Sequence, residues 1–356
     1  MKKYYKILLI TACAVSLTAC GKNKIISTGE QKIDNAVYND DTISLAPYTG
    51  LKAEKRNYKV TENALNEAIH EQLSDYIDYQ TVERASRDGD VVETDYTISI
   101  DGELYDEDNN YNFTLGEKEY GEEFDQKLTG VLAGDKLDFS LEYGADYSDM
   151  DFAGHTANFK ITVNKVQEEI LPDTSDAFIK ENFDYDTYDA FVKATRDALE
   201  ESYKEESADE LSEGLLQQVI DSSNILQYTQ DEYDEAYEEA ENEYAEYADM
   251  LGTDIDSIYD SLNVTEDSLK QEAFENLSRT FVLSAIIKNE KMTLSDEEYD
   301  KGVVDYMEIN EYDSKDDFIE DFGEDEIRKQ LLEDKAVKFI VDHAEVTQVD
   351  AEYEDS

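Results

Sequence analysis

Two periodicities of apolar and polar positions divide the chain. Apolar residues recur every three or four positions between residues 65 and 77, which predicts an amphipathic helix. The period changes to two after Gly89-Asp90, so residues 91–100 are predicted to form a strand that ends at an Asp101-Gly102 hairpin turn. Further strands and one short helix are predicted at residues 111–115, 137–143, 156–166 and 122–128. Residues 88–169 are therefore expected to form a small antiparallel sheet wrapped on one helix.

The chain beyond Pro172 shows only helical periodicity. Its long segments carry thin apolar stripes on a polar background, a pattern typical of an extended helical bundle. We expect a helical domain at residues 170–346, and hence an α+β protein. One stripe steps by four and three residues through Tyr233, Tyr237, Tyr244 and Tyr247. This spacing fits a seam against a neighbouring helix, or alternatively a wall that binds other polypeptides, because tyrosine combines apolar area with a hydrogen-bonding group.

The first twenty residues resemble a bacterial lipoprotein signal. A lysine-rich start precedes an apolar stretch, residues 7–17, that is too short to cross a ~30 Å hydrocarbon core. The sequence Leu17-Thr18-Ala19-Cys20 resembles a lipobox, in which Cys20 is acylated, for instance with palmitate, and becomes the first mature residue. The alternative is an ordinary signal peptide with an incidental cysteine. We expect residues 1–19 to be the signal peptide and the lipid on Cys20 to be the membrane anchor.

Three other segments lack a strong pattern. Residues 20–47 are polar and aperiodic, and we expect a flexible tether between the lipid and the fold. Residues 48–87 contain the first helix and are expected to be a strand and helix that lead into the sheet. Residues 347–356 are expected to be an acidic tail.

The charge of the chain restricts its partners. It contains 89 acidic and 31 basic residues, for a formal net charge of −58. Such a surface repels the phosphates of nucleic acids and anionic lipid headgroups, so both are poor partners. With 40% hydrophobic residues and apolar periodicity nearly to its end, the chain is folded and is not a disordered acidic segment.

Cysteine and histidine predict no catalytic or metal-binding site. Signal cleavage would remove Cys13 and acylation would modify Cys20, which excludes disulfides, cysteine catalysis and cysteine-based zinc sites. His70, His155 and His343 lie far apart in the sequence and have no ligand spacing.

A calcium loop is also rejected. Asp106, Asp108, Asn110 and Glu117 match four ligand positions of such a loop, but Tyr111 stands where the loop needs a glycine. We therefore expect neither a metal nor a cofactor.

The order of these elements resembles trigger factor, in which an FKBP-type isomerase domain is followed by a helical chaperone domain. The motifs that carry the resemblance are Gly89-Asp90, Asp95–Gly102, Gly121–Asp125, Ala133–Asp135, Phe152–Phe159 and Leu171–Phe178. Their order and spacing extend the resemblance over roughly residues 50–346. It implies an FKBP-like antiparallel half-barrel on one helix at residues 88–169, followed by an elongated all-α chaperone domain of trigger-factor type. The family's ribosome-docking domain, with its Gly-Phe-Arg-x-Gly signature, has no counterpart, which implies no ribosome partner.

The resemblance also implies a site for peptidyl-prolyl isomerisation. Rotation about an X-Pro bond crosses a barrier of ~18–20 kcal/mol set by amide resonance, and the twisted amide is less polar than the planar one. An apolar pocket can favour it without a nucleophile or a metal. The family's pocket residues fall on Tyr96, Tyr105, Asp106, Phe113, Tyr120, Phe124, Tyr147 and Phe159. In a half-barrel the phenylalanines can equally be core residues, whereas tyrosines favour a position facing the pocket.

Two departures from the family pattern predict reduced activity. Gly121-Glu122-Glu123 replaces an Ile-Pro-Gly segment, which removes an isoleucine from the pocket floor and adds charge at its rim. Ile98 replaces a glycine of the first hairpin.

The sequence therefore predicts a lipid-anchored, extracytoplasmic isomerase and ATP-independent chaperone that acts on unfolded or newly exported polypeptides. Two alternatives remain. One is a pure holdase with a catalytically weak isomerase-like domain, and the other is a solute-binding lipoprotein of a transporter, which would show two α/β lobes.

Overall fold

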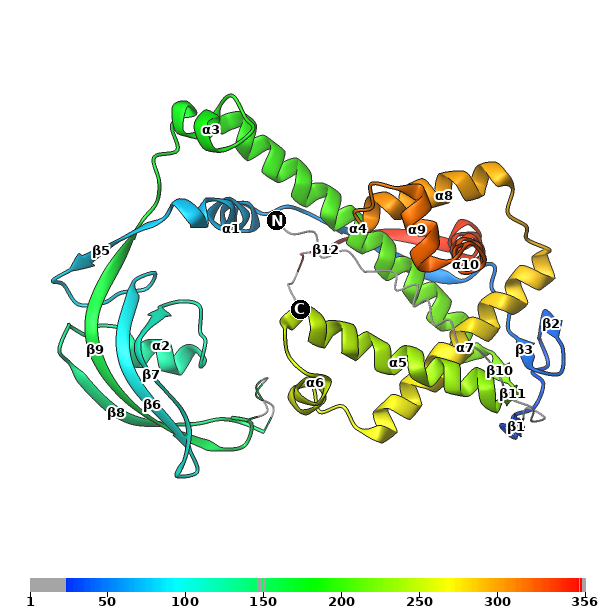
Figure 1. The fold of residues 1–356 in the computed structure, drawn as a ribbon, viewed down its shortest axis with the longest axis horizontal. Coiled ribbons are helices and arrows are strands. Elements are labelled where there is room, and N and C mark those ends of the chain that lie inside the picture. Colours follow the sequence, from blue (N-terminus) through cyan, green and yellow to red (C-terminus); the bar gives the residue numbers. More distant parts are fainter. Residues whose placement is uncertain (1–23, 146, 148, 150, 352, 354–356) are drawn as a thin grey trace. The chain divides into compact units, whose positions relative to one another are not determined.

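The computed structural model describes residues 24–351 and 353, apart from residues 146, 148 and 150. The described chain divides into two compact units (Figure 1). The inserted unit contains residues 61–197, and the helical unit contains residues 24–60 together with the chain from residue 198 onward. The helical unit is thus assembled from both ends of the chain, and the sequence of the inserted unit interrupts it.

The inserted unit is built on a curved antiparallel sheet of five strands. The strands are β5 (Asp78–Val82), β6 (Val91–Ile100), β7 (Glu103–Thr114), β8 (Lys136–Glu142) and β9 (Thr156–Ile170). Their order is β5-β9-β6-β7, and β8 pairs with a further part of β9. The helix α2 (Glu122–Leu128) lies inside the curve of the sheet (Figure 1). The predicted sheet on one helix is confirmed.

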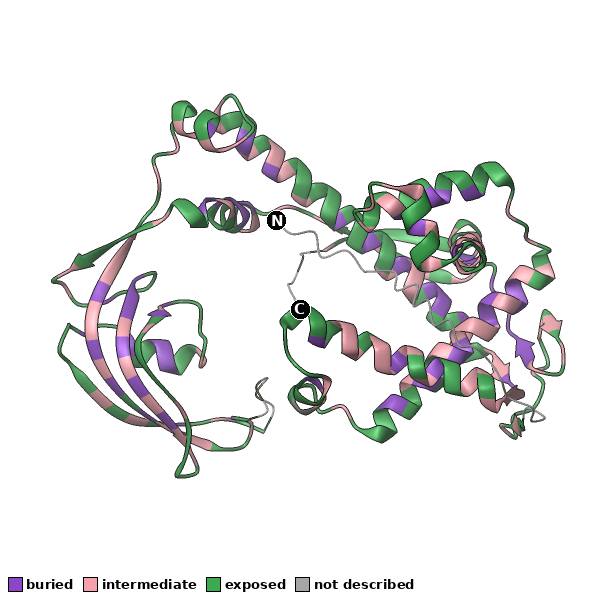
Figure 2. Ribbon diagram, viewed as in Figure 1, coloured by how far each residue is buried: buried purple, intermediate pink, exposed green. Residues whose placement is uncertain are grey.

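Alternation along β6 explains why the sheet buries one face. Val92, Thr94, Tyr96 and Ile98 are all buried, and each stands two residues from the next, so their side chains point to the same face. They pack with buried residues of β9 and with Phe124 of α2 in one continuous core. Figure 2 shows this buried face along β6 and β9.

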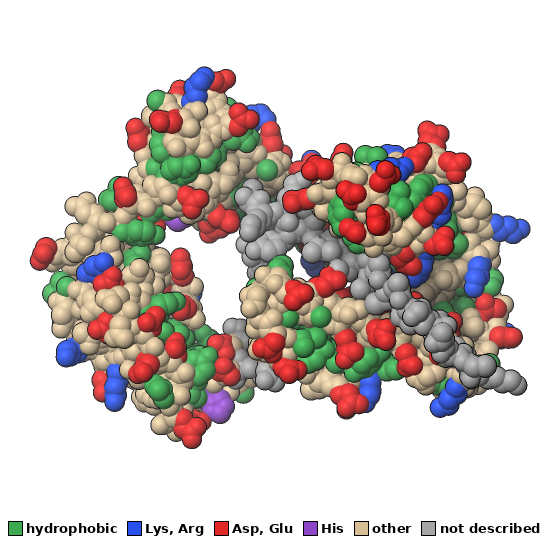
Figure 3. Space-filling model, viewed as in Figure 1, with side chains coloured by type: hydrophobic (Ala, Val, Ile, Leu, Met, Phe, Trp, Pro, Cys, Tyr) green, Lys and Arg blue, Asp and Glu red, His purple; other side chains and the backbone are tan. Residues whose placement is uncertain are grey.

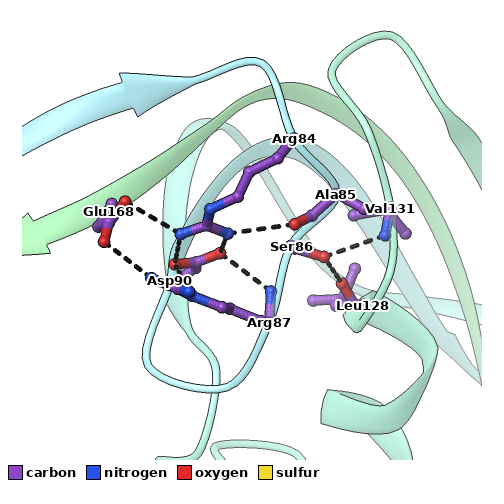
Figure 4. A network of polar contacts seen from close by, with 8 residues as sticks. All are labelled: Arg84, Ala85, Ser86, Arg87, Asp90, Leu128, Val131 and Glu168. Carbon is purple, nitrogen blue, oxygen red and sulfur yellow. Dashed lines mark hydrogen bonds and ion pairs between the residues drawn. The ribbon is translucent and has the colours of Figure 1, made fainter.

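A network of polar contacts fixes the loop between β5 and β6 (Figure 4). The Arg84 guanidinium donates to both oxygens of the Asp90 carboxylate, at 2.5 and 2.8 Å, and to Glu168 of β9 at 3.2 Å. Hydrogen bonding from Arg84 lowers the pKa of Asp90 below its usual range, so this buried carboxyl is charged at neutral pH. The Ser86 hydroxyl donates to the Leu128 carbonyl at 2.5 Å, which attaches the loop to the end of α2.

In the sequence of the inserted unit, helices precede and follow the strands of the sheet. They are α1 (Glu62–Leu73), the 3₁₀ turn η1 (Ser74–Tyr76), α3 (Asp176–Asn182) and the start of α4 (Tyr188–Ser222). Thr61 caps α1 by accepting a hydrogen bond from the Ala64 amide at 3.1 Å. Gln72 of α1 donates to the Thr195 hydroxyl of α4 at 3.1 Å, so α1 packs against the first part of α4.

The helical unit confirms the helical periodicity beyond Pro172. It contains the rest of α4 and the helices α5 (Gln230–Leu251), α6 (Ile255–Ser261), α7 (Glu266–Glu290), α8 (Asp296–Ile309), α9 (Lys315–Phe322) and α10 (Glu324–Asp342). Capping boxes begin α5, α7 and α8. Among the described residues, no helix is both long enough and apolar enough to cross a bilayer.

The expectation of a flexible tether at residues 20–47 is wrong for its described part. Residues 25–45 contain three short strands, β1 (Ile25–Ser27), β2 (Tyr38–Asn39) and β3 (Ile43–Leu45), which are joined by β10 (Asn224–Ile225) and β11 (Gln227–Thr229). Ile43 and Leu45 are 1% and 0% exposed in the core of the helical unit. Strands of two or three residues are too short to show a period, and β1 and β3 pair with strands about 180–200 residues away in sequence, so the polar composition misled the prediction.

The expected acidic tail is also wrong up to residue 351. The strand β12 (Glu345–Ala351) pairs in parallel with β4 (Lys52–Tyr58), with Val346 opposite Ala53. Beyond this strand, the Tyr353 ring stacks on Tyr203 of α4 with centroids 4.3 Å apart. Strand β12 is largely exposed and therefore lacks the apolar alternation by which a strand is recognised.

The buried position of β3 predicts the effect of its truncation. Leu45→Ala should lower the free energy of unfolding by about 2–5 kcal/mol, because it leaves a cavity in the core of the helical unit. Ile25→Ala, at a strand residue that is 62% exposed, should stay within about 0.5 kcal/mol of wild type and is the matched control. Urea unfolding of the mature chain, followed by circular dichroism, measures both. Equal midpoints for Leu45→Ala and wild type would restore the tether assignment.

Candidate active site

Aromatic side chains fill the inner side of the curved sheet around α2. The structure brings together all seven aromatic residues that the resemblance implied, and adds four that it did not. This aromatic cluster consists of Tyr96, Tyr105, Phe113, Tyr120, Phe124, Tyr147 and Phe159 together with the additional Tyr111, Phe139, Tyr143 and Phe152. The Tyr120 ring lies at its centre, 5.2–6.0 Å from the rings of Phe113, Phe124, Phe152 and Phe159.

The cluster has a buried layer and a partly exposed layer. Phe113, Phe124, Phe152 and Phe159 are at most 2% exposed and belong to the core. Tyr120, Tyr143 and Tyr147 are half-buried, and Tyr105 is 43% exposed. Phenylalanines thus form an apolar base, and tyrosines with polar tips face the solvent. The packing alternative for Phe113, Phe124 and Phe159 fits their burial.

Three tyrosine hydroxyls of the cluster donate to carboxylates. Tyr96 donates to Asp106 at 2.5 Å, which places the predicted acidic residue beside the rings. Tyr105 donates to Asp151 at 3.1 Å, and Tyr111 donates to Glu119 at 2.8 Å. Burial and then the Asp151 bond raise the pKa of Tyr105 to about 12, so this hydroxyl keeps its proton at neutral pH.

The start of α2 departs from the family pattern in a specific way. Gly121 has φ +88°, a conformation that side-chain-bearing residues rarely adopt. A Cβ atom at this position would lie 3.3 Å from the Tyr147 hydroxyl oxygen. The tyrosine therefore occupies space beside the position of the missing isoleucine. Glu122 and Glu123 are exposed on the first turn of α2, outside the apolar base.

The loop before α2 is held by a buried carboxylate. The Asp125 side chain accepts hydrogen bonds from the backbone amides of Gly116 and Lys118, at 2.7 and 3.1 Å. The Tyr143 hydroxyl donates to the Tyr120 carbonyl at 2.9 Å. These bonds fix the backbone that places the central Tyr120 ring.

This arrangement suits chemistry that requires a dry, shaped surface. Across the described residues, no group of three or more His, Cys, Asp or Glu side chains is arranged to hold a metal ion. Asp106, Asp108 and Asn110 all lie on strand β7. An apolar base with protonated hydroxyls can hold a peptide and favour a less polar, twisted amide.

The four tyrosines predicted to bind clients lie along α5. Tyr233, Tyr237 and Tyr244 are half-buried, and Tyr247 is 41% exposed. The residues of α5 that are buried are alanines at positions 236, 240 and 248, and α5 packs on α7. Tyr244 packs edge-on against Tyr259 of α6 and donates to Glu272 of α7 at 3.1 Å. The alanines are thus the buried residues of α5, and the tyrosines lie beside them.

Comparisons with known proteins find matches in both the sheet-containing part and the helical part of the chain. Residues 82–164 match the FKBP-type peptidyl-prolyl cis-trans isomerase family, and residues 252–342 match the C-terminus of bacterial trigger factor protein. The trigger factor of Finegoldia magna is 24% identical over 86% of this chain and 76% of its own length. The trigger factor of Acetivibrio thermocellus is 24% identical over 91% of this chain and 78% of its own. A solved structure of the trigger factor chaperone aligns with 90% of this chain and 78% of that chain, at 17% identity and a TM-score of 0.39.

The contact between Gly121 and Tyr147 can be tested against a second glycine that has nearly the same φ angle. Gly130 has φ +87° and open space around its Cβ position. Alanine at either position should destabilise the inserted unit by about 1–3 kcal/mol, because both glycines have a positive φ that side-chain-bearing residues rarely adopt. Only Gly121→Ala should also shift the ring resonances of Tyr147 in tyrosine-labelled NMR spectra, assigned by their loss in Tyr147→Phe. An equal shift in Gly130→Ala would contradict the contact.

Proposed function

The chain belongs to the trigger factor family and carries its FKBP-type peptidyl-prolyl isomerase domain, and from this premise we propose a specific role. The protein is a membrane-anchored, extracytoplasmic folding factor. It catalyses prolyl isomerisation and binds unfolded, newly exported polypeptides without ATP.

The Tyr147 hydroxyl is the observation that carries the catalytic part of the proposal. Tyr96, Tyr105, Tyr111 and Tyr143 each donate to a protein oxygen. Within the described residues the half-buried Tyr147 hydroxyl makes no hydrogen bond, and burial raises its pKa, so it remains a donor. A peptide carbonyl beside an X-Pro bond can accept from it, while the apolar base receives the proline ring and favours the twisted amide.

Exposed apolar side chains support the chaperone part. At the end of α5 and after α6, Tyr247, Met250, Leu251 and Leu262 are 41–58% exposed. They provide apolar area for an unfolded chain among the Asp and Glu side chains that are scattered over the face drawn in Figure 3. The sequence has no Gly-x-x-x-x-Gly-Lys phosphate loop, which fits binding without ATP.

The anchor part rests on the lipobox at residues 17–20, which lies outside the described residues. The first described strand, β1, begins at Ile25. Only four residues separate Cys20 from this strand, so a lipid on Cys20 would hold the helical unit within about 15–20 Å of the membrane surface. The acidic chain would then face the exported polypeptides at close range to the bilayer.

A holdase with a weak isomerase domain is the second candidate. The observation that favours it is the Tyr120 ring, which packs among four phenylalanines where a proline ring would need room. The solute-binding alternative is not supported, because the described chain forms a five-stranded antiparallel sheet and a helical unit with only short strand pairs, in place of two α/β lobes.

Removal of the Tyr147 hydroxyl distinguishes an active isomerase from a holdase with a weak isomerase domain. Tyr147→Phe should lower kcat/KM for a prolyl tetrapeptide about 2- to 10-fold, the effect of one hydrogen bond. Tyr79→Phe, at an exposed tyrosine of β5, should match wild type and is the control. Both variants should still suppress aggregation of a denatured client without ATP. If the wild-type protein isomerises the peptide no faster than the uncatalysed reaction, the holdase is the better assignment. If the mature chain does not suppress aggregation of the client, the proposed chaperone function is wrong.

The anchor is tested with the two cysteines of the sequence. Cys20→Ala should leave the protein unacylated and released from membranes, as judged by palmitate labelling and fractionation. Cys13→Ala, within the expected signal peptide, should remain acylated and membrane-bound. Firm membrane association of Cys20→Ala would show that the lipid is not the anchor.

A further inference from the structure

Strand β12 of the helical unit has an unpaired edge. In its parallel pair with β4, the Glu345 amide donates to the Leu51 carbonyl at 2.7 Å, so every second residue from Glu345 onward directs its backbone groups to β4. The amides and carbonyls of Val346, Gln348 and Asp350 point the other way. Within the described residues no strand pairs with them, and these backbone groups form no hydrogen bond. We call the outward backbone groups of these three residues the open edge.

The opposite edge of the strand pair is occupied by side chains of α4. The Ser207 hydroxyl donates to the Arg56 carbonyl of β4. The Gln218 side-chain amide donates to the Lys52 carbonyl at 3.4 Å. Both carbonyls belong to the alternate residues of β4 that point away from β12. The free side of the pair is therefore the β12 side, and an additional strand would join there.

The open edge lacks the features that usually protect an edge strand. Natural sheets prevent pairing with other chains by means of charged side chains, bulges or prolines on the edge. Strand β12 contains two charged residues, and both are paired: Glu345 with Lys52 at 3.8 Å, and Asp350 with Lys59 at 2.6 Å. Its register with β4 runs without a shift. By contrast, the edge strand β7 carries four acidic residues and two register shifts. The open edge is thus uncharged in net terms and unprotected, in a chain of net charge −58.

A groove between α4 and the strand pair meets the open edge at Val346. Its apolar lining is Ala53 of β4, Leu211 of α4 and Val346, which is 38% exposed. Gly214 leaves part of the α4 wall without a side chain, and its Cβ position has open space around it. The polar residues of the lining are Lys52, Glu54, Glu210, Gln218, Glu345 and Thr347. An apolar side chain of an added strand can therefore be buried where the groove meets the edge.

We propose that an extended, uncharged segment of an unfolded polypeptide adds to the open edge as a third strand and places apolar side chains at the groove. This rests on the proposed chaperone function and adds the place and the manner in which a client is held. Backbone hydrogen bonds supply affinity for any sequence that can extend, and the groove favours alternate apolar residues. A second copy of this chain is the poorer occupant, because two chains that each carry a net charge of −58 repel each other.

The test is NMR-detected hydrogen exchange on the labelled mature chain. The probe is an acetylated, amidated peptide of about eight residues, long enough to span β12, in which valine alternates with serine and threonine. At saturation it should slow exchange at the amides of Val346, Gln348 and Asp350 by about 5- to 10-fold, the protection that one hydrogen bond gives. The amides of Thr347 and Val349 point to β4 and should change little. This alternation distinguishes an added strand from general contact with the surface.

Two variants at one position separate the backbone donor from the side chain. Gln348→Pro removes an outward N–H and keeps the bonds to β4, since proline is tolerated on an edge strand where the N–H faces solvent. It should weaken peptide binding about 5- to 10-fold, as the loss of one hydrogen bond and of strand regularity does. Gln348→Ala removes the same side chain but keeps the N–H, so it should bind like wild type and is the matched control. Urea midpoints show whether each variant is folded.

A change in the peptide makes the test independent of how the variants fold. The same peptide, N-methylated at its central residues, keeps its side chains but cannot donate backbone hydrogen bonds. It should bind the wild-type chain at least about tenfold more weakly than the unmodified peptide.

Several outcomes would overturn the proposal. One is protection of amides elsewhere but not at the open edge, and another is equal affinity for the peptide and its N-methylated form. Protection of the open edge that rises with chain concentration in the absence of peptide would assign the edge to a second copy. If the mature chain suppresses aggregation of a denatured client while its open edge stays unprotected, the chaperone function holds and this site is wrong. If it neither suppresses aggregation nor binds the peptide, both are wrong.

Discussion

The helical unit depends on the burial of β3 among helices that lie far from it in sequence. Ile43 and Leu45 occupy the same core as Leu215 and Val219 of α4 and Ile286 of α7. Fully burying such side chains contributes about 1.5–3 kcal/mol each, so the segment is an essential part of the core although it precedes these helical residues by about 170 to 240 positions. With β12 paired to β4, the two ends of the chain meet in one unit, and any attachment at the amino terminus acts directly on that unit.

In the inserted unit, the same rings serve stability and the candidate site. The phenylalanines that form the apolar base are also the core against which α2 packs, so changes to them alter the fold together with the site. Tyr105 and Tyr147 are the separable part, because Tyr105 is 43% exposed and Tyr147 is half-buried, so that their hydroxyls can be changed without opening the core. Catalysis that needs only a dry surface and a few donors can be added to a folding core at small structural cost.

Local patterns were predictable, and pairings between distant segments were not. The period of two in residues 91–100 and the short helix at 122–128 appear in the structure at those residues, since both follow from adjacent side chains. Strands β1, β3 and β12 were missed because they form by pairing with distant segments, and their own sequences show no strand pattern. Tyr111 was missed in the site, although it stands two residues before Phe113 and so faces the same side of β7. Tyr143 and Phe152 had no such signal, because an irregular connection places them.

The contact between α1 and α4 bears on how such a chain reaches its native state. Within the inserted unit, Glu62 and Arg196 form an ion pair at 2.7 Å, so folding of this unit brings its own two ends together. The Ser207 hydroxyl donates to the Arg56 carbonyl across 151 residues of sequence. With the inserted unit already folded, the effective loop shortens to about 20 residues, which lowers the closure entropy by roughly 2 kcal/mol. A chain that is synthesised from its amino terminus can therefore fold the middle first, and only the arrival of β12 completes the unit to which the opening segment belongs.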